Sequence, residues 1–384
     1  MTVAEAPRER GGGILSYDRQ LKLAYGLGLG IAVIYAVLIV ENAAALGLLG
    51  YDYLAYDLAV DRLLAGQPIY DATATETGVF GLYFYPPPFL LLVLPIALLP
   101  TDVAIWAWTA ALVAASVAAI VILPVYRRVK WWMALLTALS WPLVYSIKLG
   151  QVGPIILLLF AIGWRWLDRP WPLGASIGLG TVIKVQPALL IGWAAVTGRR
   201  RAAAIAIGVV VVLAIIATLV AGPNAWLENA SLLGRVSRPI ETAHAFGVGR
   251  LAFESGMSVE AATLLHYANL VLVASVAVLT VIRGSPVASY LAVVIATQFL
   301  SPVLWDHYAL VLLLPTAWLL QRGQLWAAVI PAATSTALVL LEIEAPWLYP
   351  ASFWLALLAV AWEGGVMRTL RTQGNPESGA ILPA

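Results

Sequence analysis

The segment YDYLAYDLAVDRLLAGQPIYDA (residues 51–72) combines acidic side chains with the periodicity of a helix. A carboxylate at the mouth of a low-dielectric cavity can act as a general base towards a hydroxyl, and Asp57 is the first candidate for this role. Asp61 lies one turn further along and shares that face, although its neighbour Arg62 also fits a simple surface ion pair. Asp52 is a similar surface candidate. The alternative interpretation is that these carboxylates are solvated on the wet face of the helix.

One lysine, Lys184 in GLGTVIKVQPALL, is flanked on both sides by apolar and small residues. An ionisable group at membrane depth is costly, so it is a functional hypothesis by default. Pro187 breaks the helix three residues later, and the tip of the resulting hairpin would present the ammonium group to a phosphate or another anion. The alternative is a snorkelling or ion-paired structural lysine. Lys148, in SIKLGQVGP, is a weaker version of the same case.

The run SPVLWDHYALVLLLP (residues 301–315) places Asp306 and His307 side by side at the start of an apolar stretch. These two side chains can bind a sugar hydroxyl or a phosphate, and Trp305 can stack on a sugar ring. The alternative is an Asp–His pair at the start of a helix or at the membrane interface. The other histidines are His244 and His266, and His244 is a further candidate for the cavity.

The motif FYPPPF (residues 84–89) contains three consecutive prolines. Each proline restricts φ and lacks a backbone donor, so the chain is held in an extended form. We expect Tyr85 to line the cavity or, with Tyr83, to belong to the aromatic belt at the membrane interface. The alternative interpretation of the prolines is the N-terminus of a helix, where proline is common.

The chain lacks the sequence signatures of metal and thiol chemistry. It has no cysteine, which excludes disulfides, thiolate catalysis and cysteine-ligated metals. No HxxxH, HExxH or DxD-like run occurs, so we expect neither a metal nor another cofactor. The net charge of +2 is too small to argue for a nucleic-acid partner.

The composition indicates where these side chains must be positioned. Of the 384 residues, 62% are apolar and 11% are charged, and the mean hydropathy is +0.90. Soluble domains carry roughly 25% charged residues, so the composition predicts a single polytopic, all-α membrane domain surrounded by lipids. Long apolar runs, rather than alternating segments of ten residues, exclude an outer-membrane barrel.

Eleven to thirteen apolar runs are candidate transmembrane helices, depending on how the short ones are treated. They are 21–40, 86–100, 103–126, 131–147, 153–167, 172–184, 187–198, 202–221, 260–282, 286–300, 308–320, 325–342 and 347–366. Several hold only roughly 12–15 residues, too few to cross the bilayer at ~1.5 Å per residue. Short and broken helices are tolerated where they line a cavity, so their number predicts one.

The distribution of basic residues predicts the orientation of the chain. We expect cytoplasmic tails at residues 1–20 and 367–384 and one transmembrane domain over residues 21–366. Two longer polar loops, 41–85 and 222–258, then fall on the outer side.

Two details of this topology depend on short segments. Residues 52–65 are predicted to form a helix on the membrane surface, ended by Gly66 and Pro68. The basic trio Arg127, Arg128 and Lys130 fits the cytoplasmic side only if residues 86–100 enter the membrane and return.

Taken together, five segments resemble glycosyltransferase family 87, whose members have the polytopic GT-C architecture. The segments occur in the same order and at approximately the same spacing, and they span most of the chain. They are AYDLAVDRLLAGQPIYD (55–71), YPPPFLLLVLPIALLP (85–100), GQVGPIILLLF (150–160), IKVQPALL (183–190) and LSPVLWDHYALVLLLP (300–315). The chain departs from the family pattern near Gln186, and it has Tyr308 where a second histidine is frequent.

The resemblance implies a mannosyltransferase that uses a polyprenyl-phosphate sugar donor, with Asp57 as the general base. The Lys-x-x-Pro and Trp-Asp-His segments would line the donor cavity. Lys184, helped by Arg238 or Arg250, would stabilise the leaving phosphate. One base and direct displacement would invert the anomeric centre. We expect the active site on the outer face of a bacterial plasma membrane, with a membrane glycolipid as acceptor, while mannose and a pentose such as arabinose both stay open.

Two other classes of function compete with this hypothesis. A transporter or flippase for a lipid-linked sugar would also use broken helices and buried ionisable residues. It would show repeat symmetry between the halves of the chain, and we find none in the sequence. A non-catalytic membrane assembly subunit would tolerate replacement of Asp57 or Lys184.

Overall fold

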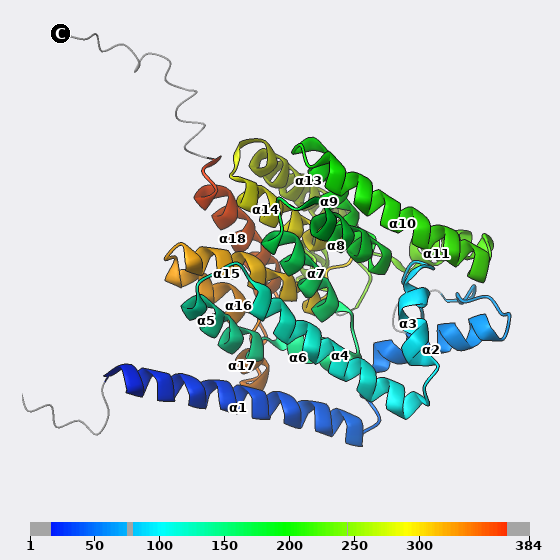
Figure 1. The fold of residues 1–384 in the computed structure, drawn as a ribbon, viewed down its shortest axis with the longest axis horizontal. Coiled ribbons are helices and arrows are strands. Elements are labelled where there is room, and N and C mark those ends of the chain that lie inside the picture. Colours follow the sequence, from blue (N-terminus) through cyan, green and yellow to red (C-terminus); the bar gives the residue numbers. More distant parts are fainter. Residues whose placement is uncertain (1–16, 75–79, 244, 367–384) are drawn as a thin grey trace, which may run out of the picture.

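The computed structural model describes residues 17–74, 80–243 and 245–366, and these residues are helical apart from loops and one isolated bridge between Ser140 and Ser335. The all-α, polytopic prediction is therefore confirmed (Figure 1). Most of both predicted tails lies outside the described residues, and the first helix, α1, begins at Tyr17.

The helices follow one another with short connections. They are α1 (Tyr17–Ala45), α2 (Tyr51–Leu64), α3 (Phe89–Ala97), α4 (Thr101–Ile122), α5 (Arg127–Ala138), α6 (Trp141–Leu149), α7 (Gly153–Arg165), α8 (Pro170–Ile183), α9 (Leu189–Val196), α10 (Arg200–Ala221), α11 (Asn224–Val236), α12 (Val248–Glu254), α13 (Val259–Arg283), α14 (Pro286–Phe299), α15 (Leu313–Gln321), α16 (Val329–Ala332), α17 (Thr336–Leu340) and α18 (Leu348–Glu363). The 3₁₀ segments are η1 (Gln186–Ala188), η2 (Asp306–Leu312) and η3 (Leu325–Ala328).

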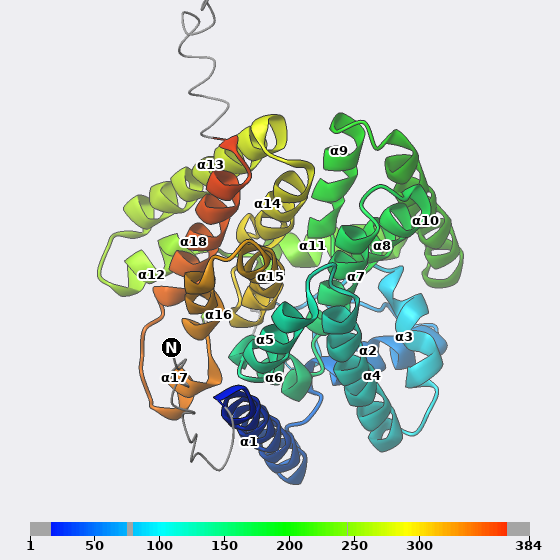
Figure 2. The same cartoon turned by 60° about the vertical axis from the view of Figure 1, so that its left-hand side comes forward.

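Among the described residues, four helices are long and apolar enough to cross a membrane by length and composition. They are α1 (from Tyr25), α4, α10 and α13, and between 11% and 33% of the most apolar stretch of each is buried in the protein. Apolar side chains that stay exposed on such helices fit a lipid environment. α1 lies at the edge of the bundle (Figure 2). There the Tyr25 ring packs edge-on against Trp131 and Trp132 of α5.

Shorter apolar helices fill the interior. α14 is the most enclosed of them, and its side chains are buried continuously from Ala288 to Phe299. Some predicted spans are shorter than expected: α3 and α15 have nine residues each, which makes each of them only ~13 Å long. Both helices end at exposed residues, α3 before Leu98 and α15 before Arg322.

The short α3 explains the position of the basic trio near residue 127. Because α3 does not cross, α4 starts at the same end of the molecule as α2 and runs to the opposite end (Figure 1). There Arg165 contacts the carbonyl of Ile122, and Gln321 accepts the backbone N–H of Tyr126. The trio therefore lies at the same end of the molecule as other basic residues. This position is the one expected if residues 86–100 enter the membrane and return.

The two polar loops meet at the other end of the molecule. The helix predicted over residues 52–65 is present as α2, and α11 comes from the second loop. Arg235 of α11 donates to the carbonyls of Ala74 and Asp71, and Asn229 donates to the carbonyl of Tyr85. Figure 1 shows α2, α3 and α11 together at the right-hand end.

A pair of glycines holds α8 close to α10. A Cβ atom on Gly174 would lie 2.5 Å from the carbonyl oxygen of Ala202, and one on Gly178 would lie 2.8 Å from that of Ala206. Glycines four residues apart allow two membrane helices to approach with backbones in contact. This packing fixes the C-terminal end of α8, where Lys184 follows.

Candidate active site

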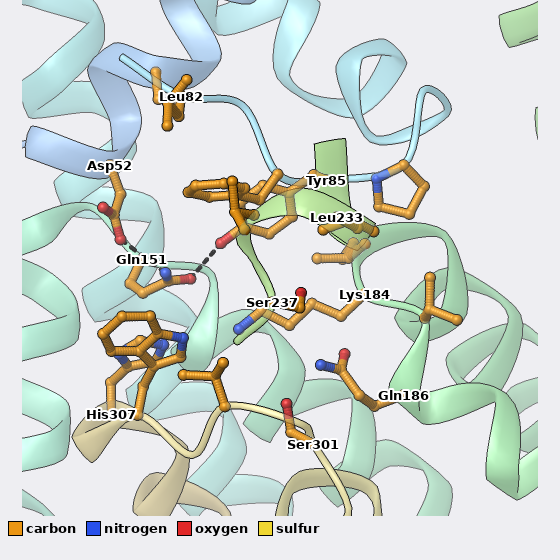
Figure 3. A pocket seen from close by; sticks show the side chains of 18 of the residues that line it. Asp52, Leu82, Tyr85, Gln151, Lys184, Gln186, Leu233, Ser237, Ser301 and His307 are labelled. Carbon is orange, nitrogen blue, oxygen red and sulfur yellow. Dashed lines mark hydrogen bonds between the residues drawn. The ribbon is translucent and has the colours of Figure 1, made fainter. Parts of the chain in front are cut away.

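A cavity of about 480 Å³ opens where the two polar loops meet the broken helices. Its wall comes from α2, the segment before α3, the end of α11, the α8–η1 connection and the segment before η2 (Figure 3). The polar and ionisable residues that line it are Tyr51, Asp52, Tyr56, Tyr85, Gln151, Lys184, Gln186, Ser237, Ser301, Trp305, His307 and Tyr308.

Asp52, in the first turn of α2, is the carboxylate of this cavity. Gln151 donates a hydrogen bond from Nε2 to its Oδ2 at 2.7 Å. Burial raises the pKa of Asp52 to about 6, although the positive charge of Lys184 and the Gln151 hydrogen bond act in the opposite direction. Asp306 adds a smaller repulsion that also raises this pKa. A carboxyl group with a pKa in this range is suited to accept a proton near neutral pH.

Lys184 reaches into the cavity from the α8–η1 connection (Figure 3). Its backbone is extended, with φ −137° and ψ 143°, between the end of α8 and the proline-containing η1. The ammonium nitrogen lies 4.3 Å from the ring centre of Tyr308 and 5.9 Å from that of Tyr85. Aromatic faces attract a cation without neutralising it, so the charge stays available for an anion. Its role towards a phosphate stays a prediction.

His307, at the start of η2, also lines the cavity. Its Nδ1 lies 3.5 Å from Oδ1 of Asp306, and the same oxygen accepts the backbone N–H of His307 at 2.7 Å. Its Nε2 is buried and has no hydrogen-bond partner among the described residues. Asp306 itself is not part of the lining, whereas Trp305 is. Asp306 therefore orients the imidazole, and Nε2 is the atom left for a ligand.

Tyr85, from the proline-rich motif, is a cavity residue and is only 7% exposed. Its hydroxyl donates to Oε1 of Gln151 at 2.5 Å, and its carbonyl accepts from Tyr70 and Asn229 at 2.7 and 3.3 Å. These bonds clamp the extended segment, and the three prolines then lead into α3. Tyr83 is buried in the same aromatic cluster, so neither tyrosine lies in an exposed interfacial belt.

The structure places Asp57 outside the cavity lining, in contrast to the expectation from the sequence. Asp57 is buried against the start of α4, where its Oδ2 accepts from the Thr101 hydroxyl at 3.1 Å and its Oδ1 lies 3.5 Å from the Tyr53 hydroxyl. Asp52 and Asp57 point in directions about 140° apart, because a helix turns ~100° per residue. Asp61 shares the Asp57 side and is exposed. Whether Asp57 acts as a base stays a prediction.

The predicted basic helpers also lie elsewhere. Arg238 forms an exposed ion pair with Glu241 at 2.8 Å, and Arg250 pairs with Glu254 at 2.6 Å. Neither arginine lines the cavity. His244 lies outside the described residues. The second loop instead contributes the end of α11, through Leu233, Val236 and Ser237.

Gln151 is one of the cavity residues that sequence reasoning missed. It lies in the GQVG turn between α6 and α7, and it is 8% exposed. The preceding Gly150 has φ +73°, and a Cβ atom there would lie 2.8 Å from Cβ of Tyr53. A polar side chain between glycines that interrupt two apolar helices was the available signal. Lys148, before this turn, is not part of the lining.

No group of three or more His, Cys, Asp or Glu residues in the described part of the chain is arranged to hold a metal ion. The arrangement offers one carboxylate, one ammonium group and one imidazole nitrogen on a wall that is otherwise aromatic, amide, hydroxyl and apolar. It places a carboxylate and a cation in one cavity at one end of the helical bundle.

Comparison with known proteins identifies relatives of this chain. The chain is similar to the polyprenol-phosphate-mannose-dependent alpha-(1-2)-phosphatidylinositol mannoside mannosyltransferase of Mycobacterium tuberculosis, with 25% identity over 323 residues that cover 74% of this chain and 75% of that relative. The sequence profile of glycosyltransferase family 87 matches residues 83–305, which is more than half of the chain. The matched region contains Tyr85, Gln151 and Lys184 of the cavity. The chain is therefore a membrane glycosyltransferase that belongs to glycosyltransferase family 87.

Proposed function

We propose that this enzyme transfers a mannosyl residue from a polyprenyl-phosphate donor to a hydroxyl group of a membrane glycolipid. The observation that carries this proposal is that Asp52 and Lys184 face one cavity at the end of the bundle opposite to the basic loops. That end is the outer face if the basic loops are cytoplasmic, as the positive-inside rule requires. The membrane is then the plasma membrane of a bacterium.

The acceptor side of the reaction depends on Asp52. Its Oδ2 is held by Gln151, so Oδ1 is the oxygen that accepts the proton of the acceptor hydroxyl. As this proton moves to Asp52, the hydroxyl oxygen forms a bond to the anomeric carbon and the bond from that carbon to the phosphate oxygen breaks. A single displacement of this kind inverts the anomeric centre.

The donor side depends on Lys184 and His307. The breaking bond leaves its electron pair on the phosphate, and the ammonium group of Lys184 stabilises the negative charge that develops there. Nε2 of His307 is placed to hydrogen-bond a phosphate oxygen or a sugar hydroxyl. A monophosphate leaving group carries less charge than a diphosphate, so one buried lysine supplies much of the counter-charge. Apolar lining residues such as Leu82, Val185 and Val303 suit the start of a prenyl chain.

The test is mannosyl transfer by purified enzyme in liposomes, with radiolabelled polyprenyl-phosphate mannose and phosphatidylinositol mannoside as the first acceptor. We expect Asp52→Asn to lower kcat by about 100-fold or more, because a general base typically contributes about 10²–10⁴-fold. Asp61→Asn is the matched control, since Asp61 is an exposed carboxylate on the same helix. Thermal melting in detergent shows whether each variant is folded.

Asp57→Asn is measured in parallel, because the sequence alone pointed to Asp57. Full activity of Asp52→Asn would overturn the assignment of the base, and loss of activity only in Asp57→Asn would move that role to Asp57. Movement of the labelled lipid across the bilayer without a new glycosidic bond would favour a transporter instead. Donors that carry mannose or arabinose, compared side by side, decide the sugar.

A further inference from the structure

A chain of buried hydrogen bonds begins and ends on α2. Tyr56 donates from its hydroxyl to the Tyr85 hydroxyl at 2.9 Å, and Tyr85 donates to Oε1 of Gln151 at 2.5 Å. Gln151 then donates from Nε2 to Oδ2 of Asp52 at 2.7 Å. Asp52 and Tyr56 are four residues apart and share one face of α2, so the chain closes on the helix where it starts.

The two groups that contact the Gln151 amide determine which atom donates and which accepts in each of these hydrogen bonds. The backbone N–H of Val152 also donates to Oε1 of Gln151, at 3.0 Å. A backbone N–H is always a donor and a carboxylate is always an acceptor, so the Gln151 amide has one orientation that satisfies both neighbours. Its NH₂ group must therefore point towards Asp52 (Figure 3).

We propose that Gln151, held by the Tyr85 hydroxyl, is a positioning residue that fixes the catalytic carboxylate of Asp52 for proton transfer. This inference rests on the proposed function, because it takes Asp52 as the general base. Gln151 occupies Oδ2 and prevents rotation of the carboxylate, so Oδ1 stays directed at the cavity. Hydrogen bonding to the charged form also favours ionisation of Asp52, which keeps a buried carboxylate able to accept a proton.

Burial makes this support effective. Tyr56, Tyr85 and Gln151 are 1%, 7% and 8% exposed, so water does not readily replace a missing partner. The chain is also fixed from outside, because Tyr70 and Asn229 hold the carbonyl of Tyr85. In a low-dielectric site a fully satisfied network is rigid, and removal of one member leaves the others unpaired.

Tyr85 additionally joins the two halves of the proposed reaction. Its hydroxyl belongs to the chain that ends on Asp52, and its ring lies 5.9 Å from the ammonium nitrogen of Lys184. A Tyr85→Phe variant keeps the ring beside Lys184 and removes only the hydroxyl. This substitution therefore separates support of the base from support of the phosphate site.

The experiment compares Gln151→Leu and Tyr85→Phe with Tyr83→Phe as the matched control. Tyr83 is a buried neighbour of Tyr85, but its hydroxyl donates to the carbonyl of Pro86 at 3.1 Å and takes no part in the chain. The readouts are kcat and KM for polyprenyl-phosphate mannose and the pH dependence of kcat/KM. A merely structural role would not move the pH profile.

Several charged and titratable groups act on Asp52 besides Gln151, and all of them are retained in these variants except the altered tyrosine hydroxyl. They are Lys184, Asp306, Tyr56, Tyr85, Tyr145 and Tyr308. His307 lines the same cavity and is also retained. The acidic limb of the pH profile is the fall in kcat/KM at low pH. A shift of this limb in Gln151→Leu is then attributable to the lost amide donor.

We expect Gln151→Leu to lower kcat by about 10- to 100-fold, while KM for the donor changes less than about twofold. The acidic limb of its pH profile moves to higher pH, because the carboxylate loses the donor that favours its charged form. Tyr85→Phe lowers kcat and shifts the acidic limb in the same directions, by about one third of the logarithmic change seen in Gln151→Leu. Tyr83→Phe keeps the kcat and the pH profile of the parent enzyme.

The positioning role is overturned if Gln151→Leu and Tyr85→Phe both keep kcat and the acidic limb while Asp52→Asn is inactive. If Gln151→Leu does not fold, Tyr85→Phe against Tyr83→Phe still decides the question. Activity in Asp52→Asn would instead remove the proposed base itself, so the two failures are distinguishable.

Discussion

Two aspartates on α2, five residues apart, have opposite surroundings. Asp52 lines the cavity, receives a hydrogen bond from Gln151 and lies within the field of Lys184. Asp57 is packed against the start of α4, where Thr101 is its nearest donor. Burial raises the pKa of both groups. A raised pKa therefore does not distinguish a carboxylate that can meet a substrate from one that is packed in the protein. The neighbouring cavity and the cation of Lys184 do distinguish them.

The position of Asp57 suggests a structural task. The hydroxyl of Thr101, the first residue of α4, donates a hydrogen bond to Asp57, and Pro100 supplies no capping side chain to that helix. Asp57 thus fastens α2 to the first turn of α4. The same helix then presents Asp52, Ala55 and Tyr56 to the cavity on its other side.

The largest effect that sharpens this comparison is expected for Lys184→Gln. The variant removes the cation that faces Asp52 and leaves the Asp57 side untouched. We expect kcat/KM for the donor to fall by about 100-fold or more, because a preorganised charge at a leaving group contributes on this scale. Lys148→Gln is the control, since Lys148 lies outside the cavity lining. Equal losses in both variants would contradict a specific role for Lys184.

The pH dependence of the parent enzyme provides the next largest effect. Asp52 has to be deprotonated to act as a base, and its pKa is about 6. We expect kcat/KM to fall about tenfold per pH unit below this pH. Asp57→Asn should leave the limb in place, whereas Lys184→Gln should move it to higher pH, because Lys184 lowers the pKa of Asp52. If Asp57→Asn instead shifts the fall in kcat/KM at low pH, the role of general base belongs to Asp57.

Gly150→Ala should affect both sides of α2 at once. Gly150 has φ +73°, and a new Cβ atom would lie 2.8 Å from Cβ of Tyr53. We expect the free energy of unfolding to fall by about 1–3 kcal/mol, since alanine is strained at positive φ. Activity falls with it, because Gln151 is the next residue. Gly192→Ala on α9 is the control, since a Cβ atom there has no neighbour within 4 Å and stability should not decrease.

The smallest effect is expected for Asp57→Asn. Because the pKa of Asp57 is raised in the folded state, its contribution to stability is present at low pH and is lost as the pH rises through that folded pKa. The uncharged amide avoids this loss, so thermal melting at neutral pH should show a variant that is as stable as the parent or slightly more stable. This difference should disappear below pH ~4, where the carboxyl group is protonated in both states. Marked destabilisation at neutral pH would contradict this account.

Much of this protein was predictable from the sequence. The apolar composition determined an all-α membrane protein, and the helix over residues 52–65 was evident from its periodicity and its glycine and proline ends. Lys184 was identifiable as a cavity candidate because an ionisable side chain at membrane depth is costly, and His307 because it stands beside Asp306 at the start of an apolar run. The family followed from five short segments in order.

Which of Asp52 and Asp57 lines the cavity was not predictable in this way. Both lie on one amphipathic helix, and the local pattern does not show which face meets a cavity and which meets α4. Gln151 was missed for a related reason, because its partners Asp52 and Tyr85 are 99 and 66 residues away in the chain. Contacts of this separation carry no local periodicity.

The sequence by itself determined the environment of the chain, its family and the identity of its scarce charged groups. Only the tertiary structure decided which of those groups share a cavity. The physical reason is that hydrophobicity and helix propensity act along the chain, whereas the cavity is made where α2, the GQVG turn and the α8–η1 connection come together in space. The rotation of α2 about its own axis, set by packing against α4, turns Asp52 towards Lys184 and Asp57 away from it.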